Sequence, residues 1–168
     1  MKNIFIMRAL IIVSALAIAF ALSSCEQEFF EPETSAMPGG GTVTTYKAYT
    51  LGAADAGDNI YGRVVFYRYS ATVTLVQIGL YNTEVETSYV SEIYTGALAD
   101  GSTTVDLELD DVDGDTGAFA TSKYFTIKDD LFYDNLDAYN ANVKVKLGAI
   151  VVSAGDIGLN ADPVAMQE

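Results

Sequence analysis

The chain has 168 residues, with 23 acidic and nine basic side chains, a formal net charge of −14, one cysteine and no histidine. Without histidine, Ser-His-Asp and Cys-His catalysis and histidine-ligated zinc are excluded. A single cysteine excludes an intramolecular disulfide. The acidic balance argues against nucleic acid and anionic membrane surfaces as partners.

The first 24 residues are typical of a signal peptide. Lys2 and Arg8 supply positive charge, and the apolar run 9–22 is too short to span a membrane. Residues 22–25, Leu-Ser-Ser-Cys, resemble the lipobox of bacterial lipoproteins, whose cysteine carries acyl chains such as palmitate. Several chains on Cys25 would anchor the mature protein stably, since each buried methylene contributes about 0.8 kcal/mol.

Residues 25–42 are expected to be a flexible, acidic and glycine-rich linker. The glutamates that follow Cys25 resemble tags that direct some lipoproteins to the outer face of the outer membrane. Alternatively, their charges only keep the linker extended and solvated. The expected location is therefore the outer membrane, with the protein facing either the periplasm or the cell surface.

Residues 43–168 are expected to form one domain made of strands. Segments rich in β-branched and aromatic residues alternate with turn residues. These segments are 42–50, 61–69, 71–80, 87–94, 104–109, 121–127, 142–147 and 150–153. Val143 and Val145 alternate with Lys144 and Lys146, as in a half-buried strand. The pattern predicts an all-β, antiparallel, Greek-key-like β-sandwich of about eight strands.

One segment departs from the strand pattern. Phe132, Leu136 and Tyr139 recur at helical spacing, and Asp129 and Asp130 precede them, where a helix N-terminus favours acids. This spacing predicts one short helical connection near 129–138.

The C-terminal half, residues 109–161, resembles the end of the CHRD domain, a module first named from chordin and present in bacterial lipoproteins. The likeness rests on the Asp-Gly-Asp-Thr-Gly turn at 113–117, the leucine-containing connection, the strand at 142–147 and the closing Gly-Asp-Ile-Gly-Leu-Asn at 155–160. It implies a β-sandwich of superoxide-dismutase-like or immunoglobulin-like form. The family's molecular role is poorly defined, so the resemblance informs the fold more than the function.

The chain departs from that family at its histidines. The family usually carries H-I-H-x-G in mid-domain and N-V-H near the end, where this chain has Glu92-Ile93-Tyr94-Thr95-Gly96 and Lys144-Val145-Lys146. Metal or proton chemistry of the relatives therefore does not transfer. We expect Glu92, Tyr94 and Lys146 to form a metal-free polar contact across two strands, on their wetter face. Alternatively, the three are unrelated surface residues.

The densest acidic run lies between two predicted strands. Asp111, Asp113 and Asp115 are candidates for weak Ca²⁺ binding, although the run fails the EF-hand register, because the sixth residue is Thr116 and the twelfth is Ser122. The alternative is a solvated hairpin turn that protects a sheet edge.

Tyrosine is abundant, with 11 residues. Tyr61, Tyr67 and Tyr69 are expected on one side of their strand, beside Arg63. Tyrosines stack on sugars and anchor protein partners, so this could be an interaction face. The alternative is the usual enrichment of tyrosine in exposed strands.

No motif of a catalytic or nucleotide-binding site is present, and no cofactor is expected. The sequence favours a lipid-anchored module of the cell envelope with a structural or interaction role and no catalysis. Its partner would be the membrane, through the lipid anchor, and an unidentified protein or glycan. The alternative is a lipoprotein that binds a small ligand, either Ca²⁺ weakly or a glycan.

Overall fold

The computed structural model describes residues 43–55 and 59–165. The predicted signal peptide, Cys25 and the linker lie outside these residues. Within the described ranges, no helix is long and apolar enough to cross a membrane.

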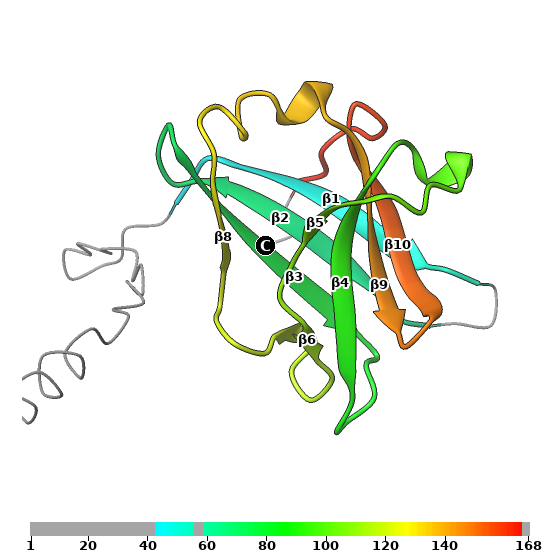
Figure 1. Cartoon of the computed structure of the whole chain (residues 1–168). Coiled ribbons are helices and arrows are strands. Elements are labelled where there is room, and N and C mark those ends of the chain that lie inside the picture. The colour runs from blue at the N-terminus through cyan, green and yellow to red at the C-terminus, as the bar shows by residue number, and fades with distance from the viewer. Residues whose placement is uncertain (1–42, 56–58, 166–168) are drawn as a thin grey trace, which may run out of the picture. The chain divides into compact units, whose positions relative to one another are not determined.

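Strands dominate the described residues, which contain no α-helix (Figure 1). The all-β, antiparallel prediction is confirmed, with ten strands instead of about eight. The strands are β1 (Tyr46–Ala53), β2 (Tyr61–Arg68), β3 (Val73–Tyr81), β4 (Ser88–Thr95), β5 (Val105–Glu108), β6 (Val112–Asp113), β7 (Ala118–Phe119), β8 (Phe125–Lys128), β9 (Asn140–Leu147) and β10 (Ile150–Gly158). The additional strands, β6 and β7, are two-residue strands on either side of the acidic turn.

The strands form a continuous hydrogen-bonded path that curls into a nearly closed barrel. Its order is β7-β6-β4-β9-β10-β1-β2-β3-β8, and β5 pairs with β4 off this path, further along β4 than β6. In Figure 1, β1, β2 and β3 lie behind β4, β9 and β10. The backbone N–H of Leu80, in β3, donates to the carbonyl of Gly117, just before β7, at 2.7 Å. This bond links the beginning of the path to β3, near its other end.

The interior of the curled sheet is the hydrophobic core. Alternate residues of each long strand point inward because successive side chains of a strand point to opposite faces. Tyr49, Phe66, Ile78, Ile93 and Val143 are fully buried there. The predicted inward orientation of Val143 and Val145 is therefore confirmed.

The connection between β8 and β9 confirms the predicted short helical connection only in part. It consists of turns followed by a 3₁₀ helix, η2 (Leu136–Ala138). Leu131 has a φ of +70°, a left-handed conformation that ends any right-handed helix begun at Asp129. The helical spacing nevertheless serves packing, because Leu136 is fully buried and Phe132 and Tyr139 pack against the core.

Candidate functional site

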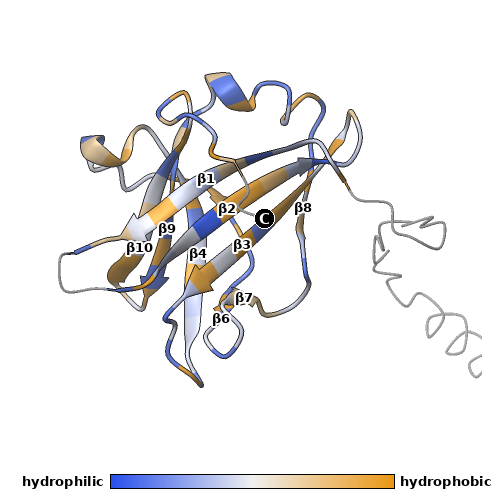
Figure 2. Cartoon of the chain, turned by 180° about the vertical axis from the view of Figure 1, so that it is seen from behind, coloured by the Kyte–Doolittle hydropathy of each residue, from blue (hydrophilic) through white to orange (hydrophobic). Residues whose placement is uncertain are grey.

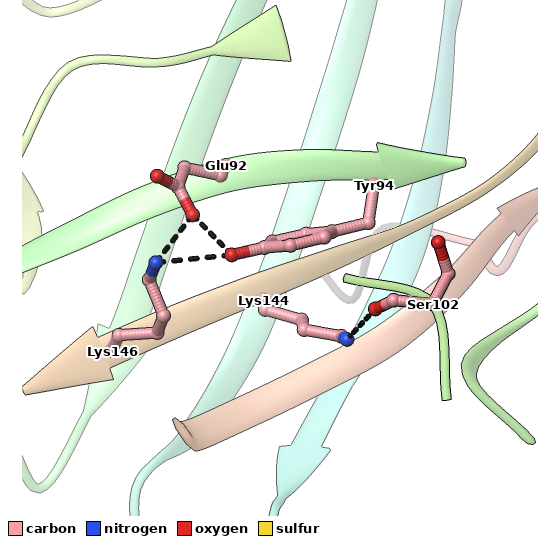
Figure 3. Close-up of polar contacts among 5 residues, drawn as sticks. All are labelled: Glu92, Tyr94, Ser102, Lys144 and Lys146. Carbon is pink, nitrogen blue, oxygen red and sulfur yellow. Dashed lines mark hydrogen bonds and ion pairs between the residues drawn. The ribbon is translucent and has the colours of Figure 1, made fainter. Parts of the chain in front are cut away.

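The structure brings Glu92, Tyr94 and Lys146 into contact (Figure 3). Glu92 and Tyr94 come from β4 and Lys146 from β9, and these two strands pair antiparallel. Lys146 Nζ lies 2.6 Å from Glu92 Oε2 and donates to Tyr94 Oη at 3.0 Å. The Tyr94 hydroxyl donates to the same Glu92 oxygen. Each polar end therefore has two partners within the cluster.

Glu92 and Tyr94 are more buried than expected for the solvent-exposed face of a strand. Glu92 is 8% exposed and Tyr94 6% exposed. The segment 96–104, which contains the 3₁₀ helix η1 (Leu98–Asp100), is held to β9 and β10 beside the cluster. The expectation of an exposed contact is thus wrong for these two side chains, because strand alternation gives the direction of a side chain but not what covers it.

Three hydrogen bonds hold that segment to the outer face of β9 and β10. Asn142 Nδ2 donates to the carbonyl of Gly96 at 2.9 Å, and Lys144 Nζ donates to the carbonyl of Ser102 at 2.6 Å. The backbone N–H of Leu98 donates to Asp156 Oδ1 at 2.6 Å. These contacts use side chains that no sequence motif had singled out for this purpose.

Tyr94 contacts two cations. Lys144 Nζ lies 4.3 Å from the centroid of its ring, in addition to the bond from Lys146 to its hydroxyl (Figure 3). A cation over a tyrosine ring contributes roughly 0.5–2 kcal/mol. The contacts orient Tyr94 from both its face and its hydroxyl, so the cluster is a rigid polar contact.

The ionisation of the cluster follows from these contacts. Burial opposes the charged form of Glu92, but hydrogen bonds from Lys146 and Tyr94 outweigh burial and lower its pKa. The hydrogen bonds to Glu92 and Tyr94 raise the pKa of Lys146. Burial and the neighbouring Glu92 raise the pKa of Tyr94. At neutral pH, therefore, an ionised carboxylate faces an ammonium and a neutral phenol.

The acidic turn uses its carboxylates to hold the chain together. Asp113 Oδ1 accepts from the backbone N–H of Asp115 at 2.8 Å, and Asp115 Oδ1 accepts from that of Glu86 at 2.7 Å. Asp111 Oδ2 accepts from Ser88 Oγ at 3.3 Å. Within residues 43–55 and 59–165, no three acidic or cysteine side chains converge as a metal site would require. The turn requires glycine at position 117, because a Cβ there would collide with the carbonyl of Leu80.

The predicted tyrosine face is the outer side of the β1–β2–β3 layer, which faces the viewer in Figure 2. In β2, Val64 and Phe66 point into the core. The alternation of side chains along the strand therefore places Tyr61, Arg63 and Tyr67 on this outer side. Tyr69 lies past the end of β2. Near Tyr67 the face is covered, since its ring packs on Tyr46 and Tyr124 and its hydroxyl donates to Gln77.

The other end of this face is open. Tyr61 and Tyr81 are cross-strand neighbours whose rings stack at 5.3 Å between centroids. They are 49% and 61% exposed. Arg63 lies directly across from Gly79, and a Cβ on Gly79 would meet no atom within 4 Å. We call Tyr61, Arg63, Gly79 and Tyr81 together the tyrosine–arginine surface.

Charge is unevenly distributed around this surface. Strands β1, β2 and β3 contain none of the 23 acidic residues. Of their three basic residues, Lys47 pairs with Asp137 and Arg68 with Asp134, each at 2.7 Å. The guanidinium of Arg63 forms no ion pair or hydrogen bond within the described part of the chain.

A shallow pocket of about 390 Å³ lies under the connection between β8 and β9. Its walls include Asp106, Asp129, Asp130, Phe132 and Tyr139. The Tyr139 hydroxyl donates to Asp106, and burial together with that carboxylate raises its pKa. Three aspartates line the pocket, so its charge is opposite in sign to that of the tyrosine–arginine surface.

Sequence reasoning missed Gly79 and Tyr81. The predicted strand ended at residue 80, and Tyr81 directly follows it. The hairpin of β2 and β3 brings Tyr81 opposite Tyr61, but this pairing depends on a register set at the turn near Ala71. Only the approximate pairing of these two ends could have been inferred from the predicted strands. The pocket joins residues from β5 and from the connection after β8, which no local motif links.

No protein-family model, curated protein or solved structure shows a significant match to this chain.

Proposed function

We propose that the protein is a lipid-anchored interaction module of the cell envelope, without catalysis, and that its partner binds the tyrosine–arginine surface. The observation that carries the proposal is an unpaired arginine beside two exposed, stacked tyrosines on strands without acidic residues. Exposed tyrosine and arginine are the residue types most enriched where proteins bind partners.

The placement in the envelope rests on the lipobox-like residues 22–25 and on the acidic residues behind Cys25. A lipid on Cys25 would hold the mature N-terminus at the outer membrane, with the domain facing the periplasm or the cell surface. The CHRD resemblance supports the same placement and a Greek-key β-sandwich as the finer description of the fold. The two facing strand layers agree with that description.

The second candidate is binding of a small ligand. For Ca²⁺, the acidic turn is a weak site, since the carboxylates of Asp111, Asp113 and Asp115 already accept hydrogen bonds from the chain. For a glycan, the tyrosine–arginine surface is the better site, because aromatic faces stack on sugars.

The interaction is tested with the unanchored protein. Cys25→Ser protein, released in soluble form, is added to washed envelope fragments from the same cells, and the bound fraction is measured by sedimentation. We expect saturable binding that falls about tenfold when Tyr61→Ala and Tyr81→Ala are introduced, because two aromatic contacts are lost. The matched control is Tyr124→Ala, which removes a tyrosine from the covered end of the same face.

Two results would contradict the proposal. One is that the Cys25→Ser protein fails to bind the fragments. The other is that it binds them equally well with and without Tyr61 and Tyr81, while circular dichroism shows all variants folded.

A further inference from the structure

We propose that the ligand of the tyrosine–arginine surface is an acidic polysaccharide, in which the carboxylate of a hexuronate unit pairs with Arg63 and the sugar ring packs against Tyr61 and Tyr81. This inference rests on the proposed function and specifies the chemical class of its partner.

The first step is electrostatic. Arg63 is the one basic residue of β1, β2 and β3 whose side chain has no carboxylate partner in the described ranges. A guanidinium binds a carboxylate through two parallel hydrogen bonds, which makes it selective for planar anions. Because these strands contain no Asp or Glu, an arriving anion meets no repulsion from them. A cationic or neutral ligand would leave Arg63 unused.

The second step is shape. Gly79 sits across from Arg63, and Tyr81 follows two residues later on the same face of β3. A Cβ on Gly79 would meet no atom within 4 Å, so the position across from Arg63 and next to the tyrosine pair is open space. Glycine weakens the interior of a strand and often marks a place where a ligand approaches the backbone. Here it leaves room for a sugar ring at hydrogen-bonding distance from Arg63.

The third step is size. A stable protein interface buries about 800 Å² on each partner, with roughly 20–30 residues. On this face, exposure is limited to a few side chains, because Ala48, Val65 and Leu75 of the same layer are already buried. The surface matches one or two sugar units better than a protein interface. An acidic sugar satisfies the tyrosines and the arginine together.

The experiment is a calorimetric titration of the mature protein in detergent with oligogalacturonate and, as a matched ligand, its fully methyl-esterified form. The two ligands share the same sugar chain and differ at the carboxyl groups, which are charged in one and neutral methyl esters in the other. We expect binding of the acid form that weakens with salt, and at least about tenfold weaker binding of the ester. Arg63→Gln should reduce the affinity for the acid form by a similar factor, and Arg63→Lys by less, because lysine keeps the charge but not the paired geometry.

A steric variant tests the site independently of charge. Gly79→Leu places a side chain in the open space without a backbone clash, so the protein should stay folded and lose binding. Val105→Leu, in β5, is the comparison, because it enlarges an exposed side chain on a strand outside the β1–β2–β3 layer. The melting temperature of each variant reports on folding.

The outcomes separate this inference from the proposed function. If envelope fragments bind through Tyr61 and Tyr81 while oligogalacturonate does not bind, or binds no better than its ester, the acidic-glycan inference is wrong and the interaction surface stands. Binding of the acid form that survives both Arg63→Gln and Gly79→Leu would also overturn the inference. Equal binding to phosphatidylglycerol vesicles, lost in the same variants, would assign the surface to a lipid instead. Failure of both experiments rejects both proposals.

Discussion

Glu92 and Lys146 differ from the usual surface ion pair because water reaches little of either side chain. Their side chains are 11% and 21% exposed, and both also bond to the Tyr94 hydroxyl. An exposed pair contributes about 0.2–1 kcal/mol, whereas hydrogen bonds to charged groups contribute about 1.5–3 kcal/mol. Low exposure and the shared Tyr94 hydroxyl thus strengthen a contact whose residue types alone suggest little stability.

A double-mutant cycle measures this effect. Glu92→Ala and Lys146→Ala, singly and together, should give a coupling free energy of about 1.5–3 kcal/mol in urea unfolding, since the two groups share a short ion pair. The internal control is the pair Lys47 and Asp137, in which Asp137 is 69% exposed. Its coupling should stay below about 1 kcal/mol. Equal coupling in the two cycles would show that burial adds nothing.

The same pair predicts a pH dependence. The pKa of Glu92 is lowered from its ordinary value of 4.5, so its ionised form stabilises the fold above pH 4.5, and this stability is lost as the pH falls through the lowered pKa. The pKa of Lys146 is raised from 10.5, so its contribution is present below pH 10.5 and is lost as the pH rises through the raised pKa. The pair therefore stabilises the fold most between about pH 5 and 10.

The measurement compares Glu92→Gln with the wild type in urea unfolding from pH 3 to pH 8. The stability difference should be constant near neutral pH and shrink below pH 4.5, where the wild-type carboxyl also becomes neutral. Glu84→Gln, at an exposed position, serves as the control. A difference that stays unchanged down to pH 3 would contradict the lowered pKa.

At the scale of the elements, Gly117 allows the acidic hairpin of β6 and β7 to pack closely against β3. Gly117 has a φ of +68° and approaches the backbone of Leu80, whose N–H donates to its carbonyl. Gly101 has the same φ of +68°, but a Cβ there would meet nothing within 4 Å. Substitution of Gly101 therefore measures the free-energy cost of a left-handed backbone alone, whereas substitution of Gly117 adds the cost of a steric clash.

We therefore expect Gly101→Ala to lower the free energy of unfolding by about 1–2 kcal/mol, from backbone conformation alone. Gly117→Ala should cost about 1–3 kcal/mol more, because the added methyl forces β7 away from β3. Equilibrium unfolding in urea measures both. If the two substitutions cost the same, the close approach of Gly117 to β3 is not a constraint.

At the scale of the molecule, the negative charge is concentrated away from one layer of the barrel. Most acidic residues of the described ranges lie in turns and connections, and the others lie in β4, β5, β6 and β10, while β1, β2 and β3 have none. The asymmetry leaves the face that carries Arg63 without carboxylates from its own strands, as the proposed binding of an anion requires.

The anchor makes a prediction for the whole chain. Cys25→Ser should leave the precursor without lipid, so that a high-salt wash, which weakens charge-dependent binding to the envelope, moves the protein from the membrane fraction to the soluble fraction, as measured by immunoblotting after ultracentrifugation. The physical reason is that several acyl chains supply the membrane affinity, which an acidic domain without them lacks. A variant that still sediments with membranes after a high-salt wash would contradict the lipoprotein proposal.

The sequence alone determined the all-β, antiparallel class and the approximate positions of the eight principal strands, because a period of two in apolar residues and β-branched composition are local signals. The CHRD resemblance suggested Glu92, Tyr94 and Lys146 as one set, with three unrelated surface residues as the alternative. The two-residue strands β6 and β7 escaped detection because their pairing depends on how the acidic turn docks against β3 and β4. The predicted helical connection is reduced to the 3₁₀ helix Leu136–Ala138, because Leu131 has a left-handed backbone that has no marker in the sequence.

Only the tertiary structure decided what covers each side chain. Alternation along β4 pointed Glu92 and Tyr94 away from the core, yet the segment 96–104, fixed to β9 and β10, accompanies their burial. Likewise, the stacking of Tyr61 on Tyr81 beside Arg63 required the register of β2 against β3. Burial and register depend on contacts between residues distant in the chain, whereas a strand's own pattern reports only on its immediate neighbours.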